Sequence, residues 1–371
     1  MDDLIIIGGG LAGLTAAIDV ARSGFGVTVI ESKQYPQHKV CGEYVSNEIL
    51  PYFDRLAIPV REWQPRQVQR FRLHAPSGRW VESRLPLGGF GLRRFTLDER
   101  LYQLARDRGV RFALKTTVKD IAFSEDRFEV RASDGREWEA KTVVGSFGKR
   151  SGLDRRLDRS FAKEPADYIG VKFYVETDFP EDLVALYNFD GGYAGAVRVE
   201  DGTVDVAYLT RSRQLRANGG LEELEETVLY RSPPLRDLLT TTRRADVRPL
   251  TISNISFSPK EQVRNHVLMV GDAAGMIPPL CGNGMAMGVH AAKLASESVV
   301  AYLSGRETRE GMERGFHRRW HRQFARRLFW GRRLHSFMGQ PLGSELAVGA
   351  LRLMPGVLPA LIRRTHGAAF A

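Results

Sequence analysis

The stretch HKVCGEYVSNE, residues 38–48, brings together residue types that can do chemistry. Cys41 is one of only two cysteines among 371 residues, and it stands beside a glycine, between the basic pair His38 and Lys39 and the acidic Glu43. A thiol can donate a proton or act as a nucleophile, and a low thiol pKa would need nearby positive charge of this kind. What this thiol does therefore depends on what the preceding residues bind.

Three glycines near the N-terminus, Gly8, Gly10 and Gly13, form the pattern Gly-x-Gly-x-x-Gly between a short apolar strand and an alanine-rich helix. The first glycine suits a tight turn, the second lets the backbone approach a pyrophosphate, and the third packs the helix against the strand. Glu31 ends the next apolar strand, where a carboxylate can accept a hydrogen bond from a ribose hydroxyl. With a helix N-terminus aimed at the phosphates, these elements predict a dinucleotide site.

A second glycine-rich segment, VGDAAGMIPPLCGNGMAMG at residues 270–288, again has the pattern of a strand, an acidic residue, a loop and an apolar helix. It resembles the flavin-contacting motif of the FAD-dependent oxidoreductases that include the geranylgeranyl reductases and the aromatic-ring hydroxylases. The resemblance implies that Asp272 holds the ribityl chain and that Pro279, Gly282 and Gly284 shape the loop beneath the isoalloxazine ring. The N-terminus of the following helix would face the part of the ring that gains negative charge on reduction.

KVCGE, residues 39–43, resembles a motif of the geranylgeranyl reductase-like branch, in which the cysteine loop lies close to the flavin. By this resemblance Cys41 lies at the active site, and Cys41 and Glu43 are the candidate catalytic residues. Arg94, in RFTLD, matches the family's arginine that contacts the cofactor. The expected cofactor contacts are Gly8, Gly10, Ala12, Gly13, Glu31, Ser32, Cys41, Gly42, Arg94, Val118, Gly148, Asp272, Pro279, Gly282, Gly284 and Met285.

The resemblance implies an FAD-dependent oxidoreductase that takes electrons from a transiently bound NAD(P)H and passes them to a hydrophobic, isoprenoid or polyketide-like small molecule. In a reductase, Cys41 or a neighbour would supply a proton as hydride reaches a double bond, and KVCGE favours this reaction. In a flavin monooxygenase, reduced flavin and oxygen would hydroxylate an aromatic or lipid-like substrate, and PLCGNGMAMG resembles both branches. A flavin-fold protein that binds a lipid without turnover is the third alternative.

The sequence departs from the family pattern in several places. Phe147 replaces an acidic residue of many relatives, which puts the usual route of NAD(P)H engagement in doubt. Gly195, in GGYAGAVR, stands where the reductases carry a tryptophan, so we expect a reshaped substrate pocket. No second Gly-x-Gly-x-x-Gly follows a strand, and no Trp-x-Trp pair occurs, which argues against a separate nicotinamide domain and against tryptophan halogenation.

The predicted fold class is α/β: a Rossmann-like FAD-binding domain of the glutathione reductase/hydroxylase type, with an inserted antiparallel β-sheet substrate domain and C-terminal helices. We assign residues 1–65, 95–165 and 260–305 to an interleaved FAD-binding domain, residues 66–94 and 166–259 to the substrate domain, and residues 306–371 to a C-terminal helical region. Within these segments we expect a hairpin at residues 67–85, and a helix from Thr96, capped through Glu99, to Gly109.

Much of the formal charge of +10 lies near the C-terminus, where arginines are dense from Arg306 to Arg333. Apolar residues recur there every fourth position, as do arginines two positions later; these are Met312, Phe316, Trp320, Phe324 and Leu328, and Arg314, Arg318, Arg322 and Arg326. The pattern predicts an amphipathic helix whose basic face is either solvated or in peripheral contact with an anionic membrane surface. The apolar stretch 346–362 can line a tunnel, but Pro355 and Pro359 prevent one straight span.

No run of eighteen apolar residues is free of charge or proline, and the two cysteines show neither disulfide nor zinc spacing. We therefore expect a cytoplasmic protein with reduced thiols. The alternative is a cytoplasmic protein that also makes peripheral contact with the inner membrane surface. No nucleic-acid-binding module is recognised, so nucleic acid is not expected as a partner.

Overall fold

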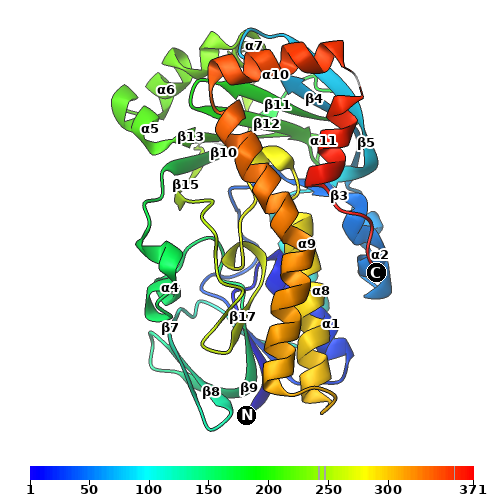
Figure 1. Ribbon diagram of the computed structural model, residues 1–371, viewed down its shortest axis with the longest axis vertical. Coiled ribbons are helices and arrows are strands. Elements are labelled where there is room, and N and C mark those ends of the chain that lie inside the picture. The colour runs from blue at the N-terminus through cyan, green and yellow to red at the C-terminus, as the bar shows by residue number, and fades with distance from the viewer. Residues whose placement is uncertain (241–242, 246–247, 355) are drawn as a thin grey trace.

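The computed structural model describes residues 1–240, 243–245, 248–354 and 356–371. Its strands form two sheets, of eight and nine strands. In Figure 1 the first sheet lies near the N-terminus, at the bottom of the view, and the second lies at the top, next to the C-terminal helices. The α/β fold class predicted from the sequence is confirmed. Pro355, which we expected to interrupt the last helices, lies outside the described residues.

The first sheet has a parallel core in the order β17-β9-β1-β2-β6, with β16 antiparallel at one edge and the antiparallel strands β7 and β8 continuing from β9. Its strands come from three separated parts of the chain: β1 (Asp2–Ile7), β2 (Val27–Ile30), β6 (Arg111–Ala113), β7 (Val118–Ser124), β8 (Arg127–Ala132), β9 (Glu137–Gly145), β16 (Val263–Arg264) and β17 (Val267–Met269). Strands β2 and β17 and the last four residues of β1 and β9 are buried, as expected for a parallel sheet covered by helices.

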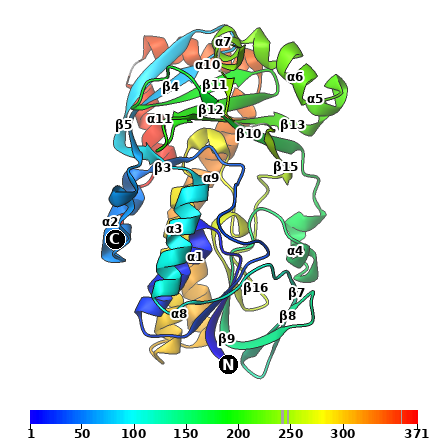
Figure 2. The ribbon, with the colours of Figure 1, turned by 180° about the vertical axis from the view of Figure 1, so that it is seen from behind.

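A layer of long helices lies beside this sheet. The helices are α1 (Leu11–Arg22), α3 (Arg94–Asp107), α8 (Gly284–Leu303) and α9 (Arg309–Met338). Helix α1 packs between α3 and α8, and α9 packs against α8, as the two opposite views show (Figures 1 and 2). Shorter elements connect the rest: α2 (Leu50–Arg55), α4 (Gly152–Arg156), η1 (Asn47–Ile49), η2 (Val60–Trp63), η3 (Ser160–Lys163), η5 (Gly271–Ala273) and η6 (Pro279–Cys281).

The second sheet runs in the order β14-β10-β13-β12-β11-β4-β5-β3, with β15 also paired to β10. Its strands are β3 (Tyr44–Ser46), β4 (Arg66–His74), β5 (Trp80–Gly91), β10 (Tyr168–Glu176), β11 (Leu183–Phe189), β12 (Gly192–Arg198), β13 (Val204–Arg211), β14 (Arg243–Arg244) and β15 (Leu250–Ile255). Strands β10 to β13 pair in antiparallel fashion, as predicted, whereas β4 joins β11 in parallel. The two strands come from distant segments, so no tight turn forces them to be antiparallel.

The two faces of the second sheet are covered by different helices. One face packs against α5 (Ser212–Asn218), α6 (Leu221–Thr227), η4 (Leu229–Arg231) and α7 (Pro233–Thr240). The other packs against the end of α9 and against α10 (Pro341–Leu353) and α11 (Val357–Thr365). Strand β3, which lies within the predicted first segment of the FAD-binding domain, pairs with β5 at the edge of this second sheet.

Two predictions about helices had different outcomes. Helix α3 begins at Arg94 rather than at Thr96, because carboxylates from elsewhere in the chain accept its first amides: Glu43 accepts from the Arg94 amide at 2.7 Å and Glu200 from the Arg93 amide at 2.9 Å. Thr96 donates its hydroxyl to Glu200 instead of capping the helix. The amphipathic α9 is confirmed, since its predicted apolar stripe is buried and its predicted arginine stripe is exposed.

Among the described residues, no single helix has the length and apolar character needed to cross a membrane. Helices α10 and α11 reach that length and composition only as a pair, and they are bent by 119° relative to each other.

Candidate functional site

The glycine loop after β1 has backbone geometry that only glycine permits. Gly8 has a φ of +103°, and a Cβ atom there would lie 2.3 Å from the carbonyl oxygen of Ser146. A Cβ atom on Gly13 would lie 2.1 Å from the carbonyl oxygen of Gly8, so α1 could not approach β1 as closely with any other residue. Gly10 is the N-cap of α1, as the fingerprint requires.

Two cations face this helix N-terminus. A Cβ atom on Gly10 would meet Lys39 Nζ at 3.4 Å and Arg94 Nη2 at 4.0 Å. Both cations bind the buried Asp98, Lys39 at 3.2 Å and Arg94 at 2.8 Å. Burial alone would raise the pKa of Asp98, but Arg94 and Lys39 hold it below its usual value. Free amides, a helix dipole and two oriented cations suit a diphosphate, so the residues present fit the pyrophosphate of FAD.

Glu31 lies at the end of β2, next to the same loop. Its carboxylate accepts hydrogen bonds from the Gly9 amide at 2.7 Å, the Lys33 amide at 2.9 Å and the Ser32 hydroxyl at 3.1 Å. The acid is therefore fixed beside the glycine loop, where a ribose hydroxyl is expected. Ser32, which was predicted to contact the cofactor, helps to hold the Glu31 carboxylate in place through its hydroxyl.

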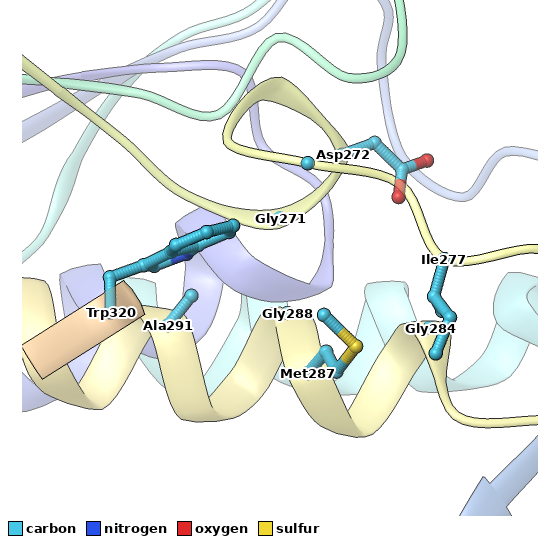
Figure 3. A pocket seen from close by; sticks show the side chains of 9 residues that line it. Gly271, Asp272, Ile277, Gly284, Met287, Gly288, Ala291 and Trp320 are labelled. Carbon is cyan, nitrogen blue, oxygen red and sulfur yellow. The ribbon is translucent and has the colours of Figure 1, made fainter. Parts of the chain in front are cut away.

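Asp272 lies in η5, between β17 and α8. In Figure 3 its side chain points away from Trp320, which extends from α9 towards the loop at Gly271. Burial raises the pKa of Asp272, while Lys260, Arg94, Lys149 and Lys39 oppose the increase. Because two of these cations also face Gly10, the structure brings the two glycine-rich motifs to one charged region.

The loop before α8 meets the Cys41 loop. Cys41 Sγ lies 3.7 Å from the Sδ of Met285, in the first turn of α8. Gly282 has a φ of +62°, and a Cβ atom on it would lie 3.2 Å from the Tyr44 ring. Helix α8 begins at Gly284, directly after this loop, as the motif predicted. The structure thus places these two loops together, as their shared proximity to one ring requires.

The two thiols differ in their surroundings. Desolvation raises the pKa of Cys41, against the opposing effect of Arg94 and Lys172, so the positive charge near it does not produce a low thiol pKa. Cys281 is buried beneath α9, where a Cβ atom on Gly331 would lie 3.3 Å from its sulfur, and burial raises its pKa to about 12. Both thiols are free, and both are protonated at neutral pH.

Glu43 belongs to a buried ionic cluster that the sequence did not reveal. Its carboxylate forms an ion pair with Lys172 and accepts from the Tyr174 hydroxyl at 2.9 Å. Lys172 donates to the Tyr174 hydroxyl at 2.8 Å and lies 3.4 Å from Asp205. Burial raises the pKa of Glu43 in spite of Lys172, and it raises that of Asp205 still more. Glu43 thereby fastens the Cys41 loop to strands β10 and β13.

The remaining predicted contacts have varied positions. Ala12 packs against η5 and α8, since Cβ atoms on Gly271 and Gly288 would lie 3.2 and 3.7 Å from its own. Val118 begins β7 and is buried, and Gly148 follows β9 with a φ of +83° and open space around its Cα. Gly42 is likewise open, and Pro279 begins η6, where the next amide, of Leu280, donates to the Tyr193 hydroxyl at 3.1 Å.

Sequence reasoning missed several residues of this region. Lys39 belongs to the KVCGE motif and Asp98 to the RFTLD motif, but their contact with each other depends on the fold. Lys172 and Asp205 left a usable signal, because each interrupts an otherwise apolar strand, where an unpaired charge would be costly.

Comparison with known proteins agrees with this geometry. A protein-family model described as an FAD binding domain matches residues 3–40. Menaquinone reductase of Mycobacterium tuberculosis is 25% identical over 313 residues, which cover 80% of this chain and 76% of that protein. Digeranylgeranylglycerophospholipid reductase 2 of Methanopyrus kandleri is 24% identical over 360 residues, covering 93% of this chain and 88% of its own length.

Solved structures show the same fold. A geranylgeranyl bacteriochlorophyll reductase-like protein from Thermoplasma acidophilum superposes with a TM-score of 0.82 at 19% identity, covering 98% of this chain and 96% of that one. A flavin-dependent brominase has a TM-score of 0.82 at 17% identity, covering 100% and 94%. Fold and site therefore define an FAD-binding flavoprotein. The chain is an FAD-dependent oxidoreductase, similar in sequence to the digeranylgeranylglycerophospholipid reductases and in fold to a geranylgeranyl bacteriochlorophyll reductase-like protein.

Proposed function

We propose that the protein reduces a carbon–carbon double bond of a hydrophobic, isoprenoid-like substrate, with NADH or NADPH as the electron donor. The observation that carries the proposal is the contact between the Cys41 loop and the start of α8, with 3.7 Å between the sulfurs of Cys41 and Met285. The names of the relatives support it, because menaquinone and digeranylgeranyl lipids both carry isoprenoid chains.

FAD, when bound, supplies hydride for this kind of reaction. The glycine loop, Lys39 and Arg94 would hold its pyrophosphate, and Asp272 its ribityl chain. Addition of hydrogen to a double bond needs one proton for each hydride. Cys41 keeps a proton on Sγ at neutral pH because its pKa is raised, so it is the proposed proton donor. Glu43 keeps the Cys41 loop in place and has no free route to a substrate, since it is 1% exposed.

The substrate face is proposed from the pleat of β12. Tyr193, Gly195 and Val197 alternate along the strand and therefore share one face of the sheet. The Tyr193 hydroxyl accepts a hydrogen bond from the amide of Leu280, in the loop before α8, so this face of the sheet is turned towards that loop. A Cβ atom on Gly195 would have no neighbour closer than 3.9 Å, so a methyl-sized group fits there, where a tryptophan would fill the space.

Reduction and reoxidation of the flavin test the proposal. We expect a yellow protein that is bleached anaerobically by NADH or NADPH, and whose colour returns on adding a short-chain menaquinone or a geranylgeranyl lipid, with the product two hydrogen atoms heavier per reduced bond. Cys41→Ser should retain flavin and bleaching but lose substrate-dependent reoxidation.

Admission of oxygen to the bleached protein separates the two flavin reactions. A hydroperoxyflavin absorbance, followed by a hydroxylated product, would replace the reductase proposal with the monooxygenase. Bleaching without reoxidation by any unsaturated lipid would refute the proposed substrate class, and absence of bleaching would refute the nicotinamide donor.

A further inference from the structure

We propose that the C-terminal helices form a docking surface for an anionic lipid bilayer. This C-terminal surface consists of outward side chains on the last turns of α9, on α10 and on α11, which lie together over one face of the second sheet (Figure 1). Its apolar members include Phe329, Phe337, Leu342, Leu346, Leu353 and Met354. The docking surface stands independently of the reaction proposed above.

Helix α10 is apolar on two opposite faces. Val348 and Leu351 are buried against the sheet, whereas Leu342, Leu346 and Leu353 are 72%, 60% and 84% exposed. A solvated surface helix carries polar residues on its outer face, so a second apolar face indicates a non-aqueous partner. Among the described residues, seven of the ten exposed large hydrophobic side chains fall between residues 329 and 357. The apolar exposure is therefore local rather than scattered over the molecule.

Positive charge is concentrated in the same part of the chain. Residues 329–371, which form this surface, contain five arginines, no lysine and one acidic residue; the arginines are Arg332, Arg333, Arg352, Arg363 and Arg364. That acidic residue, Glu345, is already engaged by the Ser77 hydroxyl at 2.9 Å and by Arg79 at 2.6 Å.

The combination of charge and exposed apolar side chains selects a bilayer among the possible occupants. Anionic headgroups attract the arginines, and the acyl boundary takes up the leucines and phenylalanines. A second copy of this chain would present the same positive charge and be repelled. A nucleic acid would pair with the arginines but leave the apolar side chains uncovered. A docked bilayer would lie over the helices that cover the Gly195 face of the second sheet.

Vesicle co-sedimentation of the flavin-loaded protein tests the surface. We expect binding to vesicles of phosphatidylglycerol and phosphatidylcholine that falls as salt is raised, and weak binding to phosphatidylcholine alone. Arg352→Gln with Arg363→Gln should weaken binding about twenty-five-fold, since each arginine near an anionic surface is worth about fivefold. Leu346→Asn with Leu353→Asn should remove the binding that persists at high salt.

Arg155→Gln with Arg156→Gln is the matched control, because both are exposed on the distant α4 and the change in net charge is the same. It should bind as the parent does, and all variants should keep the parent's flavin content and circular dichroism. Equal weakening by the control would show that only net charge matters and overturn the docking surface. The proposal would also be overturned if the protein did not bind anionic vesicles, or if it sedimented as a dimer that the leucine variant abolishes.

Discussion

Replacement of Lys172 by methionine tests whether the charge of Lys172 stabilises the buried cluster that it forms with Glu43 and Asp205. Lys172 is fully buried, and it forms ion pairs with Glu43 and Asp205, whose side chains are each 1% exposed. Methionine keeps most of the volume but removes the charge. Two carboxylates then remain buried without a cation between them, which is the costly way to break a buried ion pair.

The expected loss is about 3–5 kcal/mol of unfolding free energy at pH 8. Native domains are stable by about 5–15 kcal/mol, so the variant should fold but with little stability left. The loss should depend on pH in a definite direction. Burial raises the folded-state pKa of Glu43 and Asp205 above their ordinary values of 4.5 and 3.8, so stability is fully present below these values and falls as pH rises through the folded-state pKa. Lys172 opposes this increase, so its removal should raise both pKa values further, and the stability difference between parent and variant should be larger at pH 8 than at pH 5.

Urea unfolding followed by circular dichroism at pH 5, 6.5 and 8 measures this gap. Lys141→Met is the matched control, because Lys141 pairs with Asp3 at 2.8 Å on the surface, where its side chain is 47% exposed. The control should lose no more than about 1 kcal/mol. A gap for Lys172→Met below about 1 kcal/mol at pH 8, or one that is equal at pH 5 and pH 8, would refute the ionic explanation and leave only a packing defect.

Three further outcomes are expected. Gly10→Val should lose bound FAD, because its side chain would enter the space beside Lys39 and Arg94. Full flavin absorbance in the purified variant would contradict the assignment of the pyrophosphate to this loop. Both thiols should react slowly with iodoacetamide at pH 8 and fully in urea, because burial raises the pKa of Cys41 and of Cys281; rapid reaction of the folded protein would contradict this. Gly195→Trp should raise KM for bulky isoprenoid substrates at least tenfold while flavin bleaching by NAD(P)H is unchanged; an unaltered KM would place the substrate elsewhere.

The parts of the fold that sequence could predict are those with local causes. The glycine spacing predicted the turn because a Cβ atom on Gly8 or Gly13 would lie within 2.3 Å of a backbone oxygen, and because Gly10 is the N-cap of the helix that follows. The apolar and basic stripes of α9 were predictable because they follow helical periodicity. The start of α3 was not, because the acceptors for its first amides, Glu43 and Glu200, lie more than fifty residues from it in the chain.

The residues of the candidate site divide in the same way. Glycine and acidic positions within the two motifs could be assigned by type and spacing. Lys172 and Asp205 stand out in apolar strands, but that they pair with each other follows only from the β10–β13 pairing. The parallel pairing of β4 with β11 could not be predicted from neighbouring residues either, since no turn connects the two strands.

Glu43 shows how the two sheets are tied into one site. One oxygen of its carboxylate accepts the first amide of α3, a helix beside the first sheet, and the same carboxylate pairs with Lys172 of the second sheet. Arg94, the residue that supplies this amide, also faces Gly10 and binds Asp98. A shift of the second sheet would therefore move both the Cys41 loop and the cation beside the pyrophosphate position. Glu43 is consequently better explained as the residue that positions Cys41 and Arg94 relative to each other than as a group that exchanges protons with substrate.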